Sequence, residues 1–240
     1  MDTPEAAATF TPYSFTHVAL LAITVIGALL LVRFGRRHRG TPKAETFTRV
    51  FAGVELVVTL GFIICWLLPP LFNLQQSLPL HLSDLLRLVT AYALWSRRPW
   101  AVALTYYWGL TLNSQALLTP DLYLDIAPVL EFASYWSQHI LVMWAVVYLT
   151  WGLGLHPNWR SYRLTLAVTV AWAAVVLAIN RLLGTNYGYL NSKPSGASLL
   201  DVMGGWPWYL VVALAMLAAL WALITWPWTR RMGNAGLRGK

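Results

Sequence analysis

The sequence contains few charged residues. Only 11% of its 240 residues are Asp, Glu, Lys or Arg, whereas 58% are hydrophobic. A soluble domain usually has about 25% charged and roughly 45–50% apolar residues. The chain therefore has too little charge to cover a surface that faces water. We expect most of its surface to face lipid, in one compact bundle without a separate soluble domain.

Cysteine is nearly absent, and the histidines show no metal-binding spacing. Cys65 is the single cysteine, which excludes an internal disulfide, and it lies in an apolar run where it is expected to pack as a small hydrophobe. The sequence has no His-x-x-x-His or HExxH pattern. A metal site would need tertiary folding to assemble residues such as His81, His139, Asp84 and Asp121. We therefore expect no metal and no cofactor.

Basic residues are missing from the first 32 positions. Asp2 and Glu5 precede the first apolar run, and the first basic residue is Arg33. A secretory signal would begin with a basic segment. We expect the first apolar run to be a retained helix, preceded by a short extracytoplasmic segment over residues 1–14.

The net charge of +8 does not indicate a nucleic-acid partner. The basic residues lie mostly in short segments between apolar runs, which is the pattern that fixes the topology of membrane proteins. A nucleic-acid binder would instead show a basic face on a soluble module. We therefore expect membrane lipids, and no nucleic acid, as partners.

Seven apolar segments predict seven transmembrane helices, because each approaches the roughly 20 residues that a span requires. They cover residues 15–32, 50–68, 80–95, 100–118, 129–155, 164–183 and 206–226. The third and fifth are the weakest, since both contain ionisable residues. A five-span alternative would leave these two outside the bilayer.

The distribution of charge decides between five and seven spans. With seven spans, 14 of the 17 basic residues fall in segments on one side, around 33–49, 97–98, 160–163 and 230–240. Omitting the third or fifth span would place basic loops on both sides, against the positive-inside rule. We predict an all-α polytopic membrane protein, a bundle over residues 15–228, with the N-terminus outside and the C-terminus in the cytoplasm. Residues 229–240 are expected to form a disordered cytoplasmic tail.

Polar residues converge at the outer ends of five predicted helices, which predicts one polar cavity below the outer leaflet. The alternative is a structural network of hydrogen bonds between helices. We expect the binding residues of such a cavity to be His81, Arg87, Asn113, Gln115, Asp121, Asn186, Tyr187 and Asp201.

Two local spacings in this group are informative. Asp84 and Arg87 are three residues apart on one helix, which favours an ion pair over a catalytic role for the arginine. His139 is either a hydrogen-bonded packing residue or, if a serine lies across the helix interface, a general base. His81 is a poorer base for Ser83, because residues two apart on a helix point in different directions.

Four stretches are similar to a known family: residues 79–84 (PLHLSD), 107–121 with its Tyr-Trp-Gly start and Gln-Ala-Leu-Leu-Thr-Pro-Asp end, 137–139 (SQH), and 183–209. Over roughly residues 50–215 the chain resembles the YwaF-like bacterial integral membrane proteins, related to the eukaryotic transmembrane-protein-164 lipid acyltransferases. This resemblance implies a location in the bacterial cytoplasmic membrane.

The resemblance also implies a reaction. The eukaryotic relatives are thought to use a cysteine on one helix and a histidine on another to move fatty acyl chains between phospholipids. The corresponding positions here are Ser83 and His139. The bacterial motif commonly reads His-Leu-Cys-Asp, so this chain has serine where the family has cysteine. A serine hydroxyl needs an adjacent base to act as a nucleophile.

The leading interpretation is a membrane-embedded lipid acyltransferase or hydrolase. Ser83 would attack an ester carbonyl and His139 would accept its proton, with Asp84, Asp121 or Asp201 orienting the histidine. Donors to the developing oxyanion would come from Asn113, Gln115 or Asn186. Two alternatives remain open: a non-catalytic lipid or small-molecule binding protein or transporter that uses the same cavity, and a purely structural membrane protein.

Overall fold

The computed structural model describes residues 10–122, 124, 126–194 and 198–237. These residues form helices and loops without a β-strand, which confirms the predicted all-α class. The described residues include seven long helices: α1 (Phe15–His38), α2 (Pro42–Leu67), α3 (Leu82–Ser96), α4 (Pro99–Trp108) with its continuation, α6 (Pro128–Val147) with its continuation, α7 (Trp159–Leu183) and α8 (Trp208–Leu237). Two short 3₁₀ turns, η3 (Tyr187–Tyr189) and η4 (Leu199–Met203), lie between α7 and α8.

Two of the long helices contain a π-helical turn. α4 passes through η1 (Gly109–Asn113) into α5 (Ser114–Leu118), and α6 passes into η2 (Tyr148–Gly152). A π turn inserts one extra residue without ending the helix, and it changes which side chains face a neighbour. Residues 99–118 and 128–152 are therefore each one continuous helix.

Local sequence signals explain where several helices begin and end. The side chains of Ser14, Thr41 and Asn158 cap α1, α2 and α7 by accepting hydrogen bonds from first-turn amides. Proline opens α2, α4 and α6, where its missing N–H costs no hydrogen bond. At the other end of α7, Gly184 adopts φ 65° and terminates the helix.

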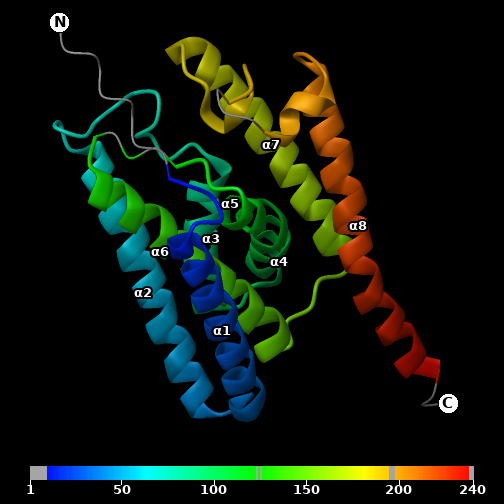
Figure 1. Ribbon diagram of the computed structural model, residues 1–240. Coiled ribbons are helices and arrows are strands. Elements are labelled where there is room, and N and C mark those ends of the chain that lie inside the picture. Colours follow the sequence, from blue (N-terminus) through cyan, green and yellow to red (C-terminus); the bar gives the residue numbers. More distant parts are fainter. Residues whose placement is uncertain (1–9, 123, 125, 195–197, 238–240) are drawn as a thin grey trace, which may run out of the picture.

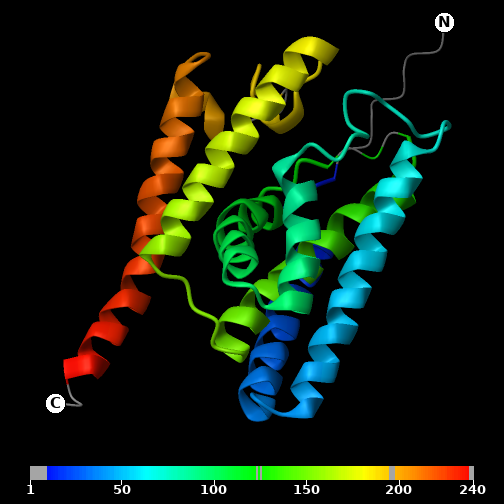
Figure 2. The same ribbon diagram turned by 180° about the vertical axis from the view of Figure 1, so that it is seen from behind.

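The helices form two groups (Figures 1 and 2). α1, α2 and α6 lie together on one side, α7 and α8 form a pair on the other, and α3 and α4 lie between them, with α4 seen almost end-on. The segments after α2, α5 and α7 gather at one end of the bundle, which we call the loop-rich end. The chain between α1 and α2 and the end of α8 lie at the opposite end.

Four helices are long and apolar enough to cross a membrane by length and composition: α1, α2, α7, and α8 over Trp208–Arg230. Many large apolar side chains on them are exposed, including Leu29, Val57 and Leu182. Contiguous exposed apolar surface is rare on soluble monomers, whereas lipid solvates it. The chain is therefore a multi-pass membrane protein. α3 and α6 are not among these four helices. α3 has only 15 residues, and α6 carries polar side chains in its first half.

α8 is helical through Leu237, and the disordered cytoplasmic tail expected over residues 229–240 stays a prediction. Its last turns contain no proline after Pro227, and the intervening glycines weaken a helix without breaking it. Residues 238–240 lie outside the described part of the chain.

The backbones of α1 and η2 approach each other at two glycines. A Cβ atom at Gly35 would lie 2.7 Å from the Cα of Gly152. Next to this contact, the Arg39 guanidinium donates a hydrogen bond of 2.7 Å to the Gly152 carbonyl. This close approach holds α1 against the end of α6.

We expect Gly35→Leu to destabilise the protein by about 1–3 kcal/mol, because backbone atoms cannot yield to the added side chain. Thermal unfolding in detergent measures the effect. Gly53→Ala on α2 is the control, since a Cβ there meets nothing within 4 Å. That change should leave stability equal or slightly higher, as expected for a mid-helix glycine. Equal stability of Gly35→Leu and wild type would contradict the role of this contact.

Candidate functional site

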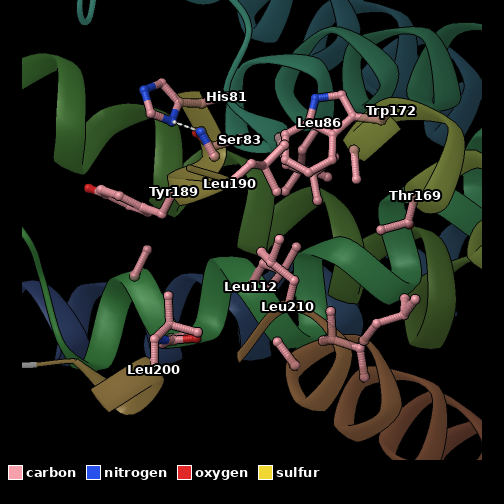
Figure 3. A pocket seen from close by; sticks show the side chains of 18 of the residues that line it. His81, Ser83, Leu86, Leu112, Thr169, Trp172, Tyr189, Leu190, Leu200 and Leu210 are labelled. Atoms are coloured by element: carbon pink, nitrogen blue, oxygen red, sulfur yellow. Dashed lines mark hydrogen bonds between the residues drawn. The ribbon is translucent and has the colours of Figure 1, made fainter. Parts of the chain in front are cut away.

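A cavity of about 650 Å³ lies between α3, the α4–α5 helix, α6, α7 and α8 (Figure 3). This volume is in the range of small-molecule sites, roughly 300–1,000 Å³. Most of the lining from α7 and α8 is apolar. The polar part of the lining includes His81, Ser83, Asn113, Gln115, Asp121, Tyr135 and His139. The site thus combines a long apolar wall with a small polar region.

The central polar contact joins Asn113 and His139. Asn113 is the last residue of the π turn η1, and His139 lies in the middle of α6. Asn113 Oδ1 is 2.7 Å from His139 Nδ1, and Asn113 Nδ2 donates to the His139 backbone carbonyl at 3.0 Å. Both residues are buried, with 2% and 5% of their surface exposed. The asparagine therefore holds both the ring and the backbone of the histidine.

This contact determines the protonation of the neutral imidazole. A carbonyl oxygen can only accept, so the Asn113 amide nitrogen must face the His139 carbonyl and Oδ1 must face the ring. Nδ1 then carries the hydrogen and donates it to Oδ1. The lone pair is left on Nε2, which is the form that a general base requires.

His81 is held in the opposite tautomer. It precedes α3, and its Nδ1 accepts a hydrogen bond of 3.3 Å from the Gly188 N–H (Figure 3). A backbone N–H can only donate, so the neutral His81 ring carries its hydrogen on Nε2. The edge of the ring packs on Tyr187, with centroids 5.1 Å apart. In the neutral rings, Nε2 of His139 can therefore accept a hydrogen bond, whereas Nε2 of His81 can donate one.

Ser83 lies in the first turn of α3 and lines the same cavity (Figure 3). Among the described residues, no hydrogen bond joins its hydroxyl to His139. The two predicted reactive residues therefore line one cavity without a hydrogen bond between them.

Asp84 and Arg87, which the sequence predicts for this site, line a different cavity, and their roles stay predictions. Arg87 Nη1 pairs with Asp84 Oδ1 at 3.0 Å, as their spacing predicts, and the other Asp84 oxygen accepts the His81 backbone N–H. Both side chains line a second cavity of about 40 Å³ between α2, α3 and α6. Adjacent positions on a helix point about 100° apart, so Ser83 and Asp84 face different cavities. The His139 ring contacts Asn113, and no hydrogen bond joins it to Asp84 among the described residues.

Asp121 and Gln115 line the large cavity as expected, whereas Asn186, Tyr187 and Asp201 do not. Asp121 accepts a hydrogen bond of 2.9 Å from the Tyr189 hydroxyl, which joins the α5–α6 and α7–α8 segments beside the cavity. The Asn186 amide donates to Ser192, and the Asp201 carboxylate accepts the Ser198 N–H that precedes η4. These two side chains make hydrogen bonds within their loops.

Tyr187 is fully buried and fixes the segment between α2 and α3. Its hydroxyl donates to the Leu74 carbonyl at 2.5 Å and accepts the Leu78 N–H at 3.1 Å. Burial raises the pKa of this phenol, and the Leu78 N–H offsets part of the effect. The hydroxyl therefore stays protonated and keeps donating at physiological pH. Tyr187 packs against the His81 ring and does not line the cavity.

The profile of the TMEM164 family matches residues 12–225. This chain belongs to the TMEM164 family. The matched residues include every cavity-lining position, from His81 to Leu217. The predicted relationship to the transmembrane-protein-164 proteins is thereby confirmed. No curated protein and no solved structure matches the chain.

Sequence reasoning missed three side chains of this TMEM164-family site. Tyr135 lies one turn before His139, with ring centroids 4.5 Å apart, and donates to the Ala116 carbonyl at 2.7 Å. Tyr189 and Trp172 also line the cavity. The i, i+4 spacing of Tyr135 and His139 was a usable signal. No sequence signal places Tyr189 or Trp172, because their positions depend on how α7 packs on α4 and α8.

Proposed function

We propose that this TMEM164-family protein transfers or hydrolyses a lipid acyl group inside the large cavity, with Ser83 as nucleophile and His139 as base. The observation that carries the proposal is the Asn113–His139 pair. It leaves the His139 Nε2 lone pair available in a cavity that Ser83 also lines. A base oriented by a fixed hydrogen bond is what an unactivated serine requires.

The reaction proceeds in two steps. The Ser83 oxygen bonds to the ester carbonyl carbon while its proton moves to His139 Nε2. The bond between that carbon and the glycerol oxygen then breaks, and the departing oxygen takes the proton from His139. A second hydroxyl, from a lysolipid or water, gives its proton to His139 and attacks the acyl-serine. The product ester or acid leaves, and the Ser83 hydroxyl is restored.

Hydrogen-bond donors in the cavity support charge development on the carbonyl oxygen. Of the three amides predicted for this role, those of Asn113 and Asn186 already donate to other groups. Gln115 lines the cavity and remains a candidate. The Nε2–H of His81, fixed by the Gly188 contact, is a second candidate.

The lining also supports a lipid substrate. The part of the cavity between α7 and α8 is lined by alanine, valine and leucine side chains, which suit an acyl chain and not a water-soluble substrate. Val170 on α7 and Val211 on α8 line it and are about half exposed, at 47% and 56%. A lipid in the bilayer would enter between these two helices.

We further propose seven membrane spans with the loop-rich end outside and the C-terminus in the cytoplasm, in the bacterial, YwaF-like branch of the family. The continuous helices 99–118 and 128–152 support this count, together with α3. The concentration of basic residues at the other end supports the orientation. The cavity then opens toward the outer leaflet.

Incubation of purified protein with a fluorophosphonate probe, and separately with phospholipid carrying a labelled acyl chain, tests the activity. We expect covalent labelling at Ser83 and movement of the label to a lysolipid or to free fatty acid. A folded protein that takes no label and releases no acyl group would overturn the enzymatic proposal.

Filling the apolar end of the cavity tests the lipid site. Ala213→Phe places a ring where Ala213 lines the cavity, and we expect it to lower lipid binding and acyl transfer about tenfold or more, since each lost 1.4 kcal/mol of affinity is a factor of ten. Ala215→Phe, two residues along α8 on an exposed position outside the lining, is the matched control. Equal losses in both variants would count against the assignment.

The second candidate is a non-catalytic lipid-binding protein. The lack of a direct Ser83–His139 hydrogen bond among the described residues favours it. Such a protein would bind labelled phospholipid with the same dependence on Ala213 but would release no acyl group.

A further inference from the structure

A buried carboxylate on α2 lies outside the acyl-transfer site. Glu55 is 1% exposed, and neither of its side-chain oxygens has a hydrogen-bond partner among the described residues. An ionised carboxylate buried without a partner is destabilised by several kcal/mol, within a membrane as in a protein core. The surroundings of Glu55 must therefore neutralise or hydrate it.

Two other buried groups without a partner in the described chain, one on α2 and one on α6, are oxygens. Thr59 lies one turn from Glu55 on the buried face of α2, and its hydroxyl also lacks a partner within the described chain. On α6, the Gln138 amide nitrogen donates to the Ser134 carbonyl at 3.0 Å, which leaves its buried Oε1 unpartnered. Carboxylate and amide oxygens can only accept hydrogen bonds. The Thr59 hydroxyl can donate only one hydrogen bond, so the acceptors outnumber the donors among these groups, and a proton or a water molecule would supply the rest.

The charges facing Glu55 do not supply a direct ion pair. From α3, Arg87 acts on Glu55 electrostatically, but its guanidinium is paired with Asp84 at 3.0 Å. From α6, the neutral Gln138 lines the second cavity beside Arg87. α1 meets α2 at the opposite end, through Phe34 and Phe47 with centroids 4.7 Å apart. Glu55 thus shares one cation with another carboxylate.

The second cavity begins one helical turn beyond Thr59 on α2. Phe62 and Ile63 of α2 line the second cavity of about 40 Å³, together with Arg87 and Gln138. This volume exceeds the roughly 10–15 Å³ that one water needs, and the polar side chains can hold such waters. The cavity also reaches Gln76 and Ser77 in the segment after α2, at the loop-rich end.

We propose that Glu55 is an exchangeable proton-binding site, connected to the loop-rich end through water in the small cavity between α2, α3 and α6. The proton on Glu55 donates toward one of the unpartnered oxygens, and it exchanges with water past Thr59 and Gln138. This site is separate from the acyl-transfer cavity, and its test needs no lipid substrate or turnover.

Infrared spectroscopy of the full-length protein in lipid nanodiscs tests the proposal, because a protonated carboxyl absorbs separately from an ionised one. At neutral pH we expect a protonated-carboxyl band in wild type and its loss in Glu55→Gln, which has nearly the same shape. Glu45→Gln on the same helix should keep the band, because Glu45 is exposed and paired with Arg49 at 2.7 Å. Transfer to D₂O should shift the band as the proton exchanges.

Gln138→Leu removes one hydrogen-bonding step from the route and should slow this deuterium shift about tenfold or more. The absence of a band that depends on Glu55 would show an ionised group and overturn the proposal. A Glu55 band that does not shift in D₂O over hours would show a sealed structural carboxyl, and would overturn it equally. Both the band that depends on Glu55 and its shift in D₂O are measured on wild type and on Glu55→Gln, which has nearly the same shape.

Discussion

Ser83→Ala is expected to lower acyl release from labelled phospholipid by at least about 10³-fold, because alanine has no oxygen to form the acyl-enzyme. Lipid binding should change little, since the change removes one oxygen from a cavity of about 650 Å³ with a largely apolar lining. The loss should therefore appear in kcat and leave KM nearly constant. Fluorophosphonate labelling should disappear in parallel.

Ser137→Ala is the matched control for this prediction. Ser137 lies on α6, outside the cavity lining, and its hydroxyl donates to the Ala133 carbonyl within its own helix. We expect its activity to stay close to that of wild type. If Ser83→Ala retained full acyl release, Ser83 would not be the nucleophile. If Ser83→Ala bound lipid more weakly and neither wild type nor any variant released an acyl group, the non-catalytic candidate would be favoured.

His139→Ala is expected to reduce acyl release by about 10²–10⁴-fold, the usual contribution of a positioned general base. The change also leaves space where the ring was. Added imidazole should therefore restore part of the rate, a rescue that a purely structural histidine would not show. Asn113→Ala should lower the rate as well, because it removes the acceptor that keeps the hydrogen on Nδ1.

His156→Ala is the control for the histidine series. His156 stacks on Trp228 with ring centroids 4.0 Å apart, away from the cavity. We expect it to retain acyl release and to show no response to imidazole. Full activity in His139→Ala would exclude this residue as the base. Loss of activity without rescue, accompanied by a lower melting temperature, would indicate that His139 mainly holds α6 against η1.

Local features were predictable because they depend on neighbours in the sequence. The Asp84–Arg87 pair follows from three-residue spacing on a helix, and the structure contains it at 3.0 Å. Apolar runs near the length of a span predicted the long helices, and all seven predicted runs fall within or overlap one of them. The polar residues at the loop-rich ends of several helices predicted a shared cavity, and six of the predicted binding or catalytic side chains line it.

The hydrogen-bond partner of the His139 ring could not be predicted from neighbouring residues in the sequence. The sequence suggested an aspartate to orient it and assigned Asn113 to the oxyanion, whereas Asn113 contacts the histidine itself. These residues are 26 positions apart on different helices, and the π turn η1 changes the direction in which Asn113 points. A shift of one residue in that turn would rotate the side chain by about 100°. Sequence periodicity does not indicate such a shift.

The sequence by itself determined that this chain is a bundle of apolar helices with polar groups at one end. Apolar segments enter lipid, and a backbone in lipid must satisfy its own hydrogen bonds, which a helix does whatever its packing. Only the tertiary structure decided which oxygen or nitrogen faces which cavity. Adjacent residues such as Ser83 and Asp84 face separate cavities. That Glu55 is buried without a hydrogen-bond partner among the described residues follows only from the packing of α3 and α6 against α2. Burial and hydrogen bonding between helices depend on the relative rotation of the helices.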